Sequence, residues 1–357
     1  MNKIVLFTIS AIISVCMPSM AQRTLKQEIK KLQQQSSVGV MYGHHDDTMY
    51  GYNWSYQDGR SDTYDICGQY PAMMSFELCR IEKGLDKSID GVPFSLIRRE
   101  IIRQAERGGS ICLSWHADNI VTGRNSWDVK DSTVVSRILN DKATNAEFMI
   151  WLDRLADFFL SLRSSDGKPI PVIFRPSHEC LGNWFWWGRP YCTPSQYKKL
   201  WKITVRHLKK RGVENVIYAY SPGSNTTDEK EYMERYPKNK YVTILGVEAY
   251  LNRYDTPDNG WLSYRQRLSS MLDCVAPIAK KKNKVLALTE TGMNHKSADG
   301  WWTQGLLPVL HNYPIAYMVV WRNKTSSTDD CYGSYPGHIT ERDFLNFSSD
   351  PTIKFCK

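Results

Sequence analysis

The sequence lacks the patterns that mark several other classes of protein. No glycine-rich phosphate loop follows any of its apolar strands, which argues against a doubly wound nucleotide-binding sheet. No His-Glu-x-x-His helix is present, and no apolar run reaches the roughly 20 residues of a membrane span. Linkers, repeats and low-complexity segments are also missing, so we expect a single catalytic or binding domain.

The first residues have the pattern of a secretory signal peptide. Lys3 precedes a short apolar stretch from Ile4 to about Val15, and Ser19-Met20-Ala21 forms a cleavage site of small residues. We therefore expect residues 1–21 to be a signal peptide and residues 22–357 to be a domain exported to the periplasm or the medium. Cys16 could indicate a lipoprotein, but Val15 is bulky where a small residue normally stands, so anchoring is disfavoured.

Charge and cysteine content say little about partners. The net charge is +9, but Lys and Arg are spread along helical segments rather than clustered, so we expect no nucleic acid partner. Removing Cys16 leaves an even number of cysteines, which an oxidising compartment permits to pair. Cys180 and Cys192 flank one aromatic loop and are the favoured pair, whereas Cys112 and Cys274 fit buried thiols equally well.

Short apolar runs alternate with amphipathic segments along the chain. This pattern is typical of a parallel sheet covered on both faces, and eight such strands predict a single (β/α)8 barrel. The expected strands are 38–44, 72–78, 110–116, 171–178, 215–221, 242–250, 284–290 and 316–321. We expect helices near 24–35, 93–107, 145–163, 195–211, 261–281 and 300–312, and loops near 120–144, 223–240 and 324–337.

Two glutamates follow predicted strands that lie across a barrel mouth from each other. Glu179 follows the fourth strand and Glu290 ends the seventh. Glycosidic cleavage needs such a pair, one protonated and one ionised. The rings of Trp184, Phe185, Trp186 and Trp187 would raise the pKa of Glu179, as a general acid requires. Arg322 and the Tyr250 hydroxyl could keep Glu290 ionised. The structural alternatives are an ion pair between Glu179 and Arg175 and a helix cap by Glu290.

Polar and aromatic residues at the other strand ends suggest sugar binding rather than a metal site. His44 and His45 point to opposite faces of an extended strand, so they cannot easily share one ion, and we expect no metal and no cofactor. Indole rings at strand ends pack well on a pyranose face while polar groups bond its hydroxyls. Other Trp residues, Trp201 among them, fit ordinary core positions.

These residues resemble glycoside hydrolase family 26, the β-mannanases, over about residues 38–325. The matching segments are Gly43–Asp47 with Tyr50-Gly51 and Trp54, Tyr70–Ala72, Trp115-His116, Arg175–Glu179, Trp184–Gly188, Tyr220–Pro222, Gly246 with Tyr250, Glu290–Gly292 and Trp321–Asn323. Glu248 departs from the pattern, because an Asp is expected at that position.

The resemblance implies Glu179 as acid/base and Glu290 as nucleophile of a retaining enzyme that cleaves β-1,4-mannosidic bonds in mannan, galactomannan or glucomannan. The substrate-binding residues that we expect are His116, His178, Trp184, Tyr250, Trp321, Arg322, Trp187, His44 and Asp47. We expect a monomer acting on polysaccharide or manno-oligosaccharides, with endo or mannobiose-releasing exo action both open. The alternatives are the same mechanism on mixed-linkage glucan or β-1,3-xylan, and a non-catalytic glycan-binding barrel.

Overall fold

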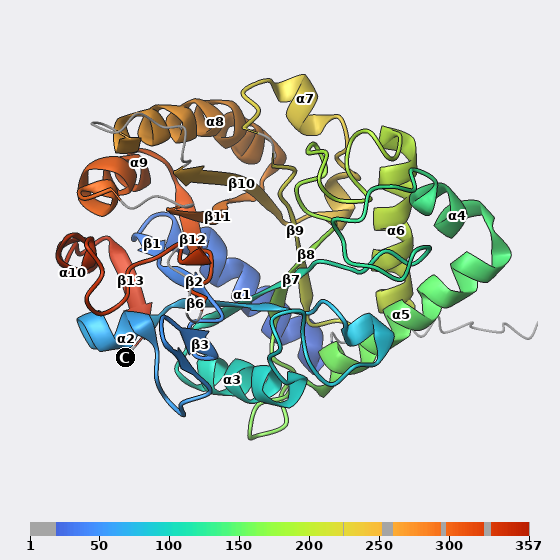
Figure 1. The fold of residues 1–357 in the computed structure, drawn as a ribbon, viewed down its shortest axis with the longest axis horizontal. Coiled ribbons are helices and arrows are strands. Elements are labelled where there is room, and N and C mark those ends of the chain that lie inside the picture. Colours follow the sequence, from blue (N-terminus) through green and yellow to red (C-terminus); the bar gives the residue numbers. More distant parts are fainter. Residues whose placement is uncertain (1–18, 224, 252–259, 294–297, 325–329, 357) are drawn as a thin grey trace, which may run out of the picture.

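The computed structural model describes residues 19–223, 225–251, 260–293, 298–324 and 330–356. Eight parallel strands form a closed barrel at its centre, with helices around the outside (Figure 1). The strands pair in chain order and β12 closes the ring by pairing with both β11 and β2. They are β2 (Gly43–His45), β6 (Met73–Glu77), β7 (Ser110–Trp115), β8 (Val172–Pro176), β9 (Val216–Tyr220), β10 (Ile244–Leu251), β11 (Val285–Met293) and β12 (Ile315–Val320). The predicted (β/α)8 fold and all eight predicted strands are confirmed.

Smaller strands extend and edge this barrel. β1 (Val40–Met41) precedes β2 and pairs with β12 and with the C-terminal β13 (Ile353–Cys356), which in turn pairs with β5 (Tyr70–Pro71). A short hairpin of β3 (Tyr50–Gly51) and β4 (Trp54–Ser55) follows β2. The sequence did not predict β3, β4, β5 or β13, because each is too short to show the alternation of apolar and polar residues that marks a strand.

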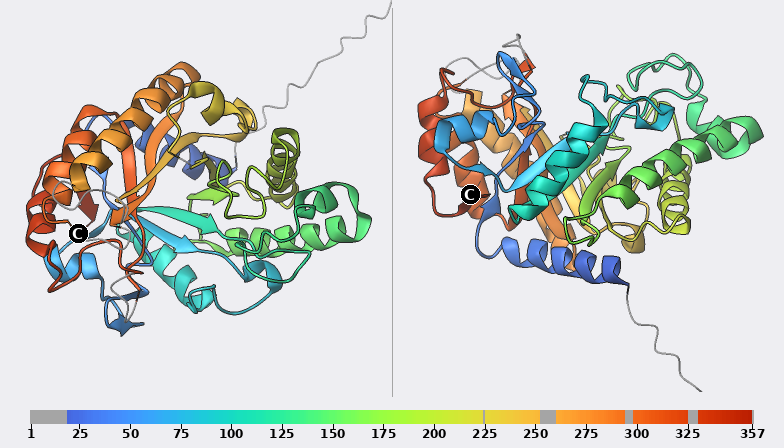
Figure 2. Two further views of the ribbon diagram at one scale, coloured as in Figure 1. Left: turned by 45° about the horizontal axis from the view of Figure 1, so that its top comes forward. Right: turned by 90° about the horizontal axis from the view of Figure 1, so that it is seen from below.

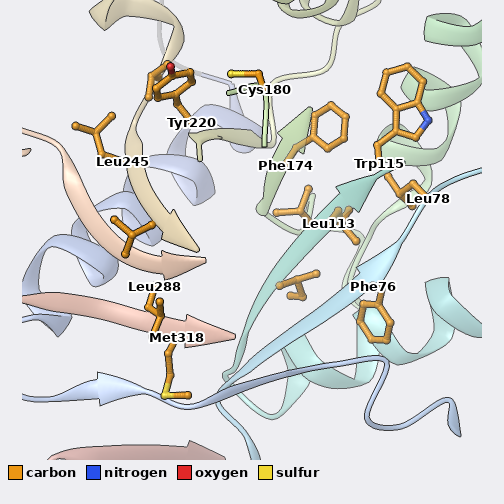
Figure 3. Packing of buried hydrophobic residues seen from close by; sticks show 14 of the residues in the cluster. Phe76, Leu78, Leu113, Trp115, Phe174, Cys180, Tyr220, Leu245, Leu288 and Met318 are labelled. Atoms are coloured by element: carbon orange, nitrogen blue, oxygen red, sulfur yellow. The ribbon is translucent and has the colours of Figure 1, made fainter. Parts of the chain in front are cut away.

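Helices cover the outer face of the barrel. They are α2 (Asp62–Cys67), α3 (Phe94–Glu106), α4 (Val134–Asn140), α5 (Lys142–Ser161), α6 (Pro194–Lys210), α7 (Glu229–Met233), α8 (Gly260–Lys282), α9 (Leu307–Asn312) and α10 (Glu341–Ser348). Short 3₁₀ turns span Ile81–Lys83 and Asn239–Tyr241, and a π-helical turn spans Trp301–Leu306. The core between strands and helices includes Phe76, Leu113 and Phe174 from three neighbouring strands (Figure 3).

Helix α1 (Met20–Gln35) lies at the end of the barrel opposite the long loops, as the right-hand view of Figure 2 shows. Leu25, Ile29 and Leu32 recur at helical spacing, and Leu32 is fully buried against side chains at the N-terminal ends of the strands. Lys31 also donates to the carbonyl of Gly108, just before β7. This end of the barrel is closed, so the open mouth lies at the C-terminal ends of the strands.

Several predictions about loops and cysteines need correction. The segments 120–144 and 223–240 contain α4, the start of α5 and α7. Val134, Val135 and Ile138 of α4 are buried, and this apolar face was too short to stand out among polar neighbours. Cys180 and Cys192 are free thiols rather than a disulfide. Cys192 Sγ instead accepts a hydrogen bond from Arg235 Nη1 at 3.2 Å.

The N-terminal prediction stays a prediction. Residues 1–18 of the expected signal peptide lie outside the described residues, and Ser19–Ala21 form the capped start of α1. Among the described residues, no helix is both long enough and apolar enough to cross a membrane.

Candidate active site

A cavity of about 510 Å³ lies at the mouth of the barrel, where the strands end. Its lining is polar and aromatic, and it comes from seven of the barrel strands, β6 to β12, or from the loops that follow them. The lining residues are Glu77, Ile89, Asp90, His116, Trp127, Glu179, Trp184, Phe185, Asn225, Glu248, Tyr250, Glu290, Trp321, Arg322 and Tyr332. In a (β/α)8 barrel this face carries the functional residues.

Glu179 projects into the cavity from a tight turn after β8. Ser177 and Glu179 both have positive φ angles, of 48° and 52°, and the Glu179 amide donates to the Ser221 carbonyl at 2.8 Å. Gly223, with a φ of +70°, passes so close that a Cβ there would lie 3.0 Å from Glu179 Cα. This packing fixes the Glu179 backbone in a conformation that most residues avoid.

The surroundings of Glu179 suit a group that holds a proton near neutral pH. Burial, together with repulsion from Glu290, raises the pKa of Glu179 to about 7. Trp184 Nε1 donates to Glu179 Oε2 at 2.6 Å, and this hydrogen bond acts in the opposite direction because it favours the ionised form. The raised pKa therefore comes from the enclosed site and the neighbouring charge, while the indole N–H moderates it.

Glu290 lies on β11 in a site built to hold a negative charge. It is 4% exposed, and its two oxygens have different donors. The Arg175 guanidinium donates to Oε1, and the Tyr250 hydroxyl donates to Oε2 at 2.8 Å. Arg175 comes from β8 and is itself 1% exposed, so the ion pair is buried. Charge-assisted hydrogen bonds of this kind favour an ionised carboxylate.

The two glutamates are close enough to act on one bond. An oxygen of Glu179, one of Glu290 and one of Glu248 lie within 4.8 Å of one another. Retaining glycosidases place their two carboxyl groups about 5–5.5 Å apart, whereas inverting enzymes need roughly 6.5–9.5 Å to admit a water. The spacing therefore matches attack by one carboxylate directly on the sugar.

Two histidines form a chain behind the carboxylates. His116 Nδ1 lies 2.6 Å from Glu77 Oε2, and His116 Nε2 lies 3.1 Å from His178 Nε2. His178 Nε2 lies 3.9 Å from Glu290. Burial lowers the pKa of His116, but the charge of Glu77 outweighs this and raises it overall, while burial and then His116 lower the pKa of His178. These opposite shifts favour the charged form of the His116 ring and the neutral form of the His178 ring.

The segment directly after the eighth barrel strand, β12, supplies Trp321 and Arg322 to the cavity lining. The Trp321 ring stacks on His45 with centroids 3.9 Å apart and an interplanar angle of 21°. Arg322 donates to Asp90 at 2.6 Å and to Asp330 at 3.2 Å, which ties the segment after β6 to the segment after β12. A planar ring and a fixed cation therefore border the cavity on this side.

Two groups of side chains in the described part of the chain could supply metal ligands. One is Glu179, Glu248 and Glu290, and the other is Cys79, Glu82 and Asp118. Arg175 already pairs with two members of the first group. In the second group Lys83 pairs with Asp118, and Trp115 Nε1 donates to Glu82 at 3.0 Å. The expectation of a metal-free site stays a prediction.

Comparison with known proteins agrees with this geometry. The sequence model of glycosyl hydrolase family 26 matches residues 17–287. The chain belongs to glycosyl hydrolase family 26. It is 30% identical over 317 residues to a mannan endo-1,4-beta-mannosidase of Bifidobacterium adolescentis, covering 83% of this chain and 31% of that protein. It is 26% identical to a mannan endo-1,4-beta-mannosidase of Bacillus subtilis, covering 73% of this chain and 68% of that protein.

A solved structure resembles this family 26 chain over almost its whole length. The structure of a family 26 beta-mannanase from Bacteroides ovatus superposes with a TM-score of 0.89 and 42% sequence identity, covering 95% of this chain and 96% of that one. The chain spans about a third of the length of the Bifidobacterium relative and about two thirds of the Bacillus one.

Three expected substrate-binding residues of this family 26 chain do not line the cavity. His44 is buried and pairs with Asp47 at 2.8 Å, and Asp47 also accepts from Ser61, so both side chains fasten β2 to α2. Trp187 is fully buried, and its Nε1 donates to the His178 carbonyl at 2.7 Å. The structure therefore corrects the expectation of direct sugar contact, because these three side chains are buried inside the protein and do not line the cavity.

Other expected site residues reach the cavity or lie directly against its lining. His116, Trp184, Tyr250, Trp321 and Arg322 line it, and His178 contacts His116 just beneath. The Tyr250 hydroxyl donates a hydrogen bond to Glu290, while its expected effect on the charge of Glu290 stays a prediction. Arg322 does not pair with Glu290, since Asp90 and Asp330 engage it, and Arg175 takes that place.

Several lining residues were not predicted as site residues, namely Glu77, Ile89, Asp90, Trp127, Asn225 and Tyr332. Glu77 ends β6, so the rule that strand ends face the mouth could have identified it. Trp127 lies in the segment between β7 and α4, is 46% exposed and stacks on His116 at 5.4 Å. No pattern in that irregular segment marks it as a cavity residue.

Proposed function

We propose that the protein is an exported, monomeric endo-acting β-mannanase that cleaves β-1,4-mannosidic bonds with retention of configuration. The observation that carries this proposal is the placement of Glu179 and Glu290 oxygens within 4.8 Å at the mouth of a family 26 barrel. The names of the Bifidobacterium and Bacillus relatives support mannan as the substrate.

In the first step, Glu290 attacks the anomeric carbon of the sugar while Glu179 gives its proton to the departing glycosidic oxygen. Arg175 and Tyr250 hold the Glu290 carboxylate in place, since both donate hydrogen bonds to its oxygens. The raised pKa of Glu179 keeps its proton available near neutral pH.

In the second step, the ionised Glu179 takes a proton from water, and the resulting hydroxide equivalent displaces Glu290 from the same carbon. Two displacements at one carbon restore the original configuration. Trp184 assists here, because its N–H stabilises the ionised form that Glu179 reaches after the first step. Trp184 is 37% exposed at the edge of the cavity, where its ring can stack on a sugar.

The test is hydrolysis of mannan, galactomannan and glucomannan by the wild type and by Glu179→Ala and Glu290→Ala. Each variant should lose activity by several orders of magnitude, while Glu234→Ala, an exposed carboxylate outside the cavity, should match the wild type. Near wild-type activity in either cavity variant would contradict the assignment.

A panel of substrates decides the remaining alternatives. Faster hydrolysis of mixed-linkage glucan or β-1,3-xylan than of mannan would move the substrate to another β-glycan, and binding of mannan without any hydrolysis would indicate a glycan-binding barrel. Early products from defined manno-oligosaccharides separate the modes of action, because endo cleavage gives a spread of sizes and exo cleavage gives mannobiose alone.

A further inference from the structure

Two carboxyl groups at the cavity share one buried guanidinium, and a third lies beside them. Arg175 Nη1 donates to Glu248 Oε1 at 2.5 Å, and Nη2 donates to Glu290 Oε1. Glu179 places an oxygen within 4.8 Å of both glutamates. One positive charge balances one carboxylate, so each of the other two carboxyl groups must be neutral or remain uncompensated in a buried site.

The hydrogen bonds show which of the three carboxyl groups has a buried oxygen without a donor. Both oxygens of Glu290 receive donors, from Arg175 and Tyr250, and Glu179 Oε2 receives Trp184 Nε1. Glu248 Oε2 is buried, and no donor in the described part of the chain forms a hydrogen bond with it. Glu248 as a whole is 4% exposed. An ionised carboxylate would leave this oxygen both desolvated and unpaired, which is costly.

A protonated carboxyl group removes this difficulty. Its carbonyl oxygen still accepts from Arg175, and its other oxygen becomes a hydroxyl that donates. The proton also removes the charge repulsion between Glu248 and the neighbouring carboxylates. We propose that Glu248 is a neutral carboxylic acid in the resting enzyme, so that the charge of Arg175 is left to Glu290.

The groups around Glu248 agree with this protonation state. Burial, then repulsion from Glu179 and Glu290, raises the pKa of Glu248 well above its ordinary value, while Arg175 and, more weakly, Ser221 oppose the shift. These groups come from β8 and the loops after β8 and β9, and from β11. Burial first, and the charge of an ionised Glu248 in addition, raise the pKa values of two phenols, Tyr232 on α7 and Tyr317 on β12, and both changes disfavour further negative charge at this place.

The consequence for catalysis rests on the proposed function. A nucleophile must be ionised, and an undivided Arg175 stabilises Glu290 in that form. A neutral Glu248 also leaves Glu179 beside one charged carboxylate rather than two, so that its pKa stays near neutrality instead of rising further. Glu248 keeps its proton through both steps and acts as a positioning residue.

The direct test is carbon-13 NMR of the protein labelled at its glutamate side-chain carboxyl carbons, comparing the wild type with Glu248→Gln. At about pH 8 ordinary glutamates are ionised. We expect one wild-type resonance at the protonated position that is missing from Glu248→Gln. Glu234→Gln is the control, and it should remove a resonance at the ionised position. Loss of an ionised resonance in Glu248→Gln would overturn the proposal.

The wild-type spectrum decides the question even if Glu248→Gln fails to fold, because glutamate resonances that are all ionised at about pH 8 would contradict a neutral Glu248. Activity gives a second readout. A neutral amide in place of a neutral acid should leave the basic limb of kcat/KM where the wild type has it. If Glu248 were ionised, its removal would shift that limb to lower pH. An inactive wild type would refute the proposed function without changing the NMR result.

Discussion

Replacing Trp184 by Phe should move the basic limb of the pH profile to higher pH. The indole N–H of Trp184 donates to Glu179 Oε2 at 2.6 Å and so favours the ionised carboxylate. Phenylalanine keeps an aromatic ring but has no donor. The pKa of Glu179, about 7 in the wild type, should therefore rise. Because the first step needs protonated Glu179, activity should persist to higher pH.

The size of this shift follows from the strength of the lost hydrogen bond. A hydrogen bond to a charged group contributes about 1.5–3 kcal/mol, and one pKa unit corresponds to about 1.4 kcal/mol, which gives a shift of about 1–2 units. Trp184 is 37% exposed, so solvent competes for the same contact. We therefore expect a shift of about 0.5–1 unit after allowance for this screening.

The assay is kcat/KM for a manno-oligosaccharide across the pH range, for the wild type, Trp184→Phe and Trp127→Phe. Trp127 lines the same cavity but stacks on His116, so its variant controls for loss of an indole without loss of the bond to Glu179. A lower rate in both variants would show only lost sugar contact. A basic limb of Trp184→Phe that stays in place, or moves to lower pH, would refute the reasoning.

Two further substitutions separate catalytic from structural roles. Arg175→Met leaves Glu290 and Glu248 buried without their cation. It should lower the free energy of unfolding by about 3–5 kcal/mol and abolish most activity. A urea-unfolding curve like that of the wild type would contradict this. Asp47→Ala should lower stability by about 1–3 kcal/mol but leave kcat/KM unchanged, because Asp47 binds His44 and Ser61 away from the cavity. Burial raises the pKa of Asp47, but His44 and Ser61 outweigh this effect and lower the pKa overall. The wild type should therefore be more stable than Asp47→Ala near neutral pH, and this difference in the free energy of unfolding should disappear as the pH falls through the lowered pKa of Asp47. A loss of activity in stable Asp47→Ala protein would show that Asp47 serves the site after all.

The sequence predicted the barrel and the position of Glu179 and Glu290 at its mouth, because both depend on local patterns. Apolar runs define the strands, and Glu179 and Glu290 stand where such runs end. The direction of individual side chains was harder to predict. His44 and His45 must point to opposite faces, but only the structure shows that His45 faces inward beneath Trp321 while His44 faces α2.

Pairings between residues far apart in the sequence could not be predicted either, because no local pattern shows which side chains meet in the folded protein. Arg175 shares its face of β8 with Ile173, a residue of the inner core, which directs its guanidinium toward Glu290 and Glu248. The assignment of Arg322 to Glu290 failed because Asp90, far away in the sequence, reaches Arg322 across the mouth. Such contacts depend on how loops pack, and no short-range pattern encodes them.

Azide rescue of the two alanine variants tests the central claim most directly. With an activated aryl β-mannobioside as substrate, Glu179→Ala should regain activity in azide and release a β-mannosyl azide, because azide replaces water in the second step. Glu290→Ala should instead give the α-azide, since azide then replaces the nucleophile itself. An α-azide from Glu179→Ala, or a β-azide from Glu290→Ala, would contradict the assignment of acid/base and nucleophile to these two glutamates.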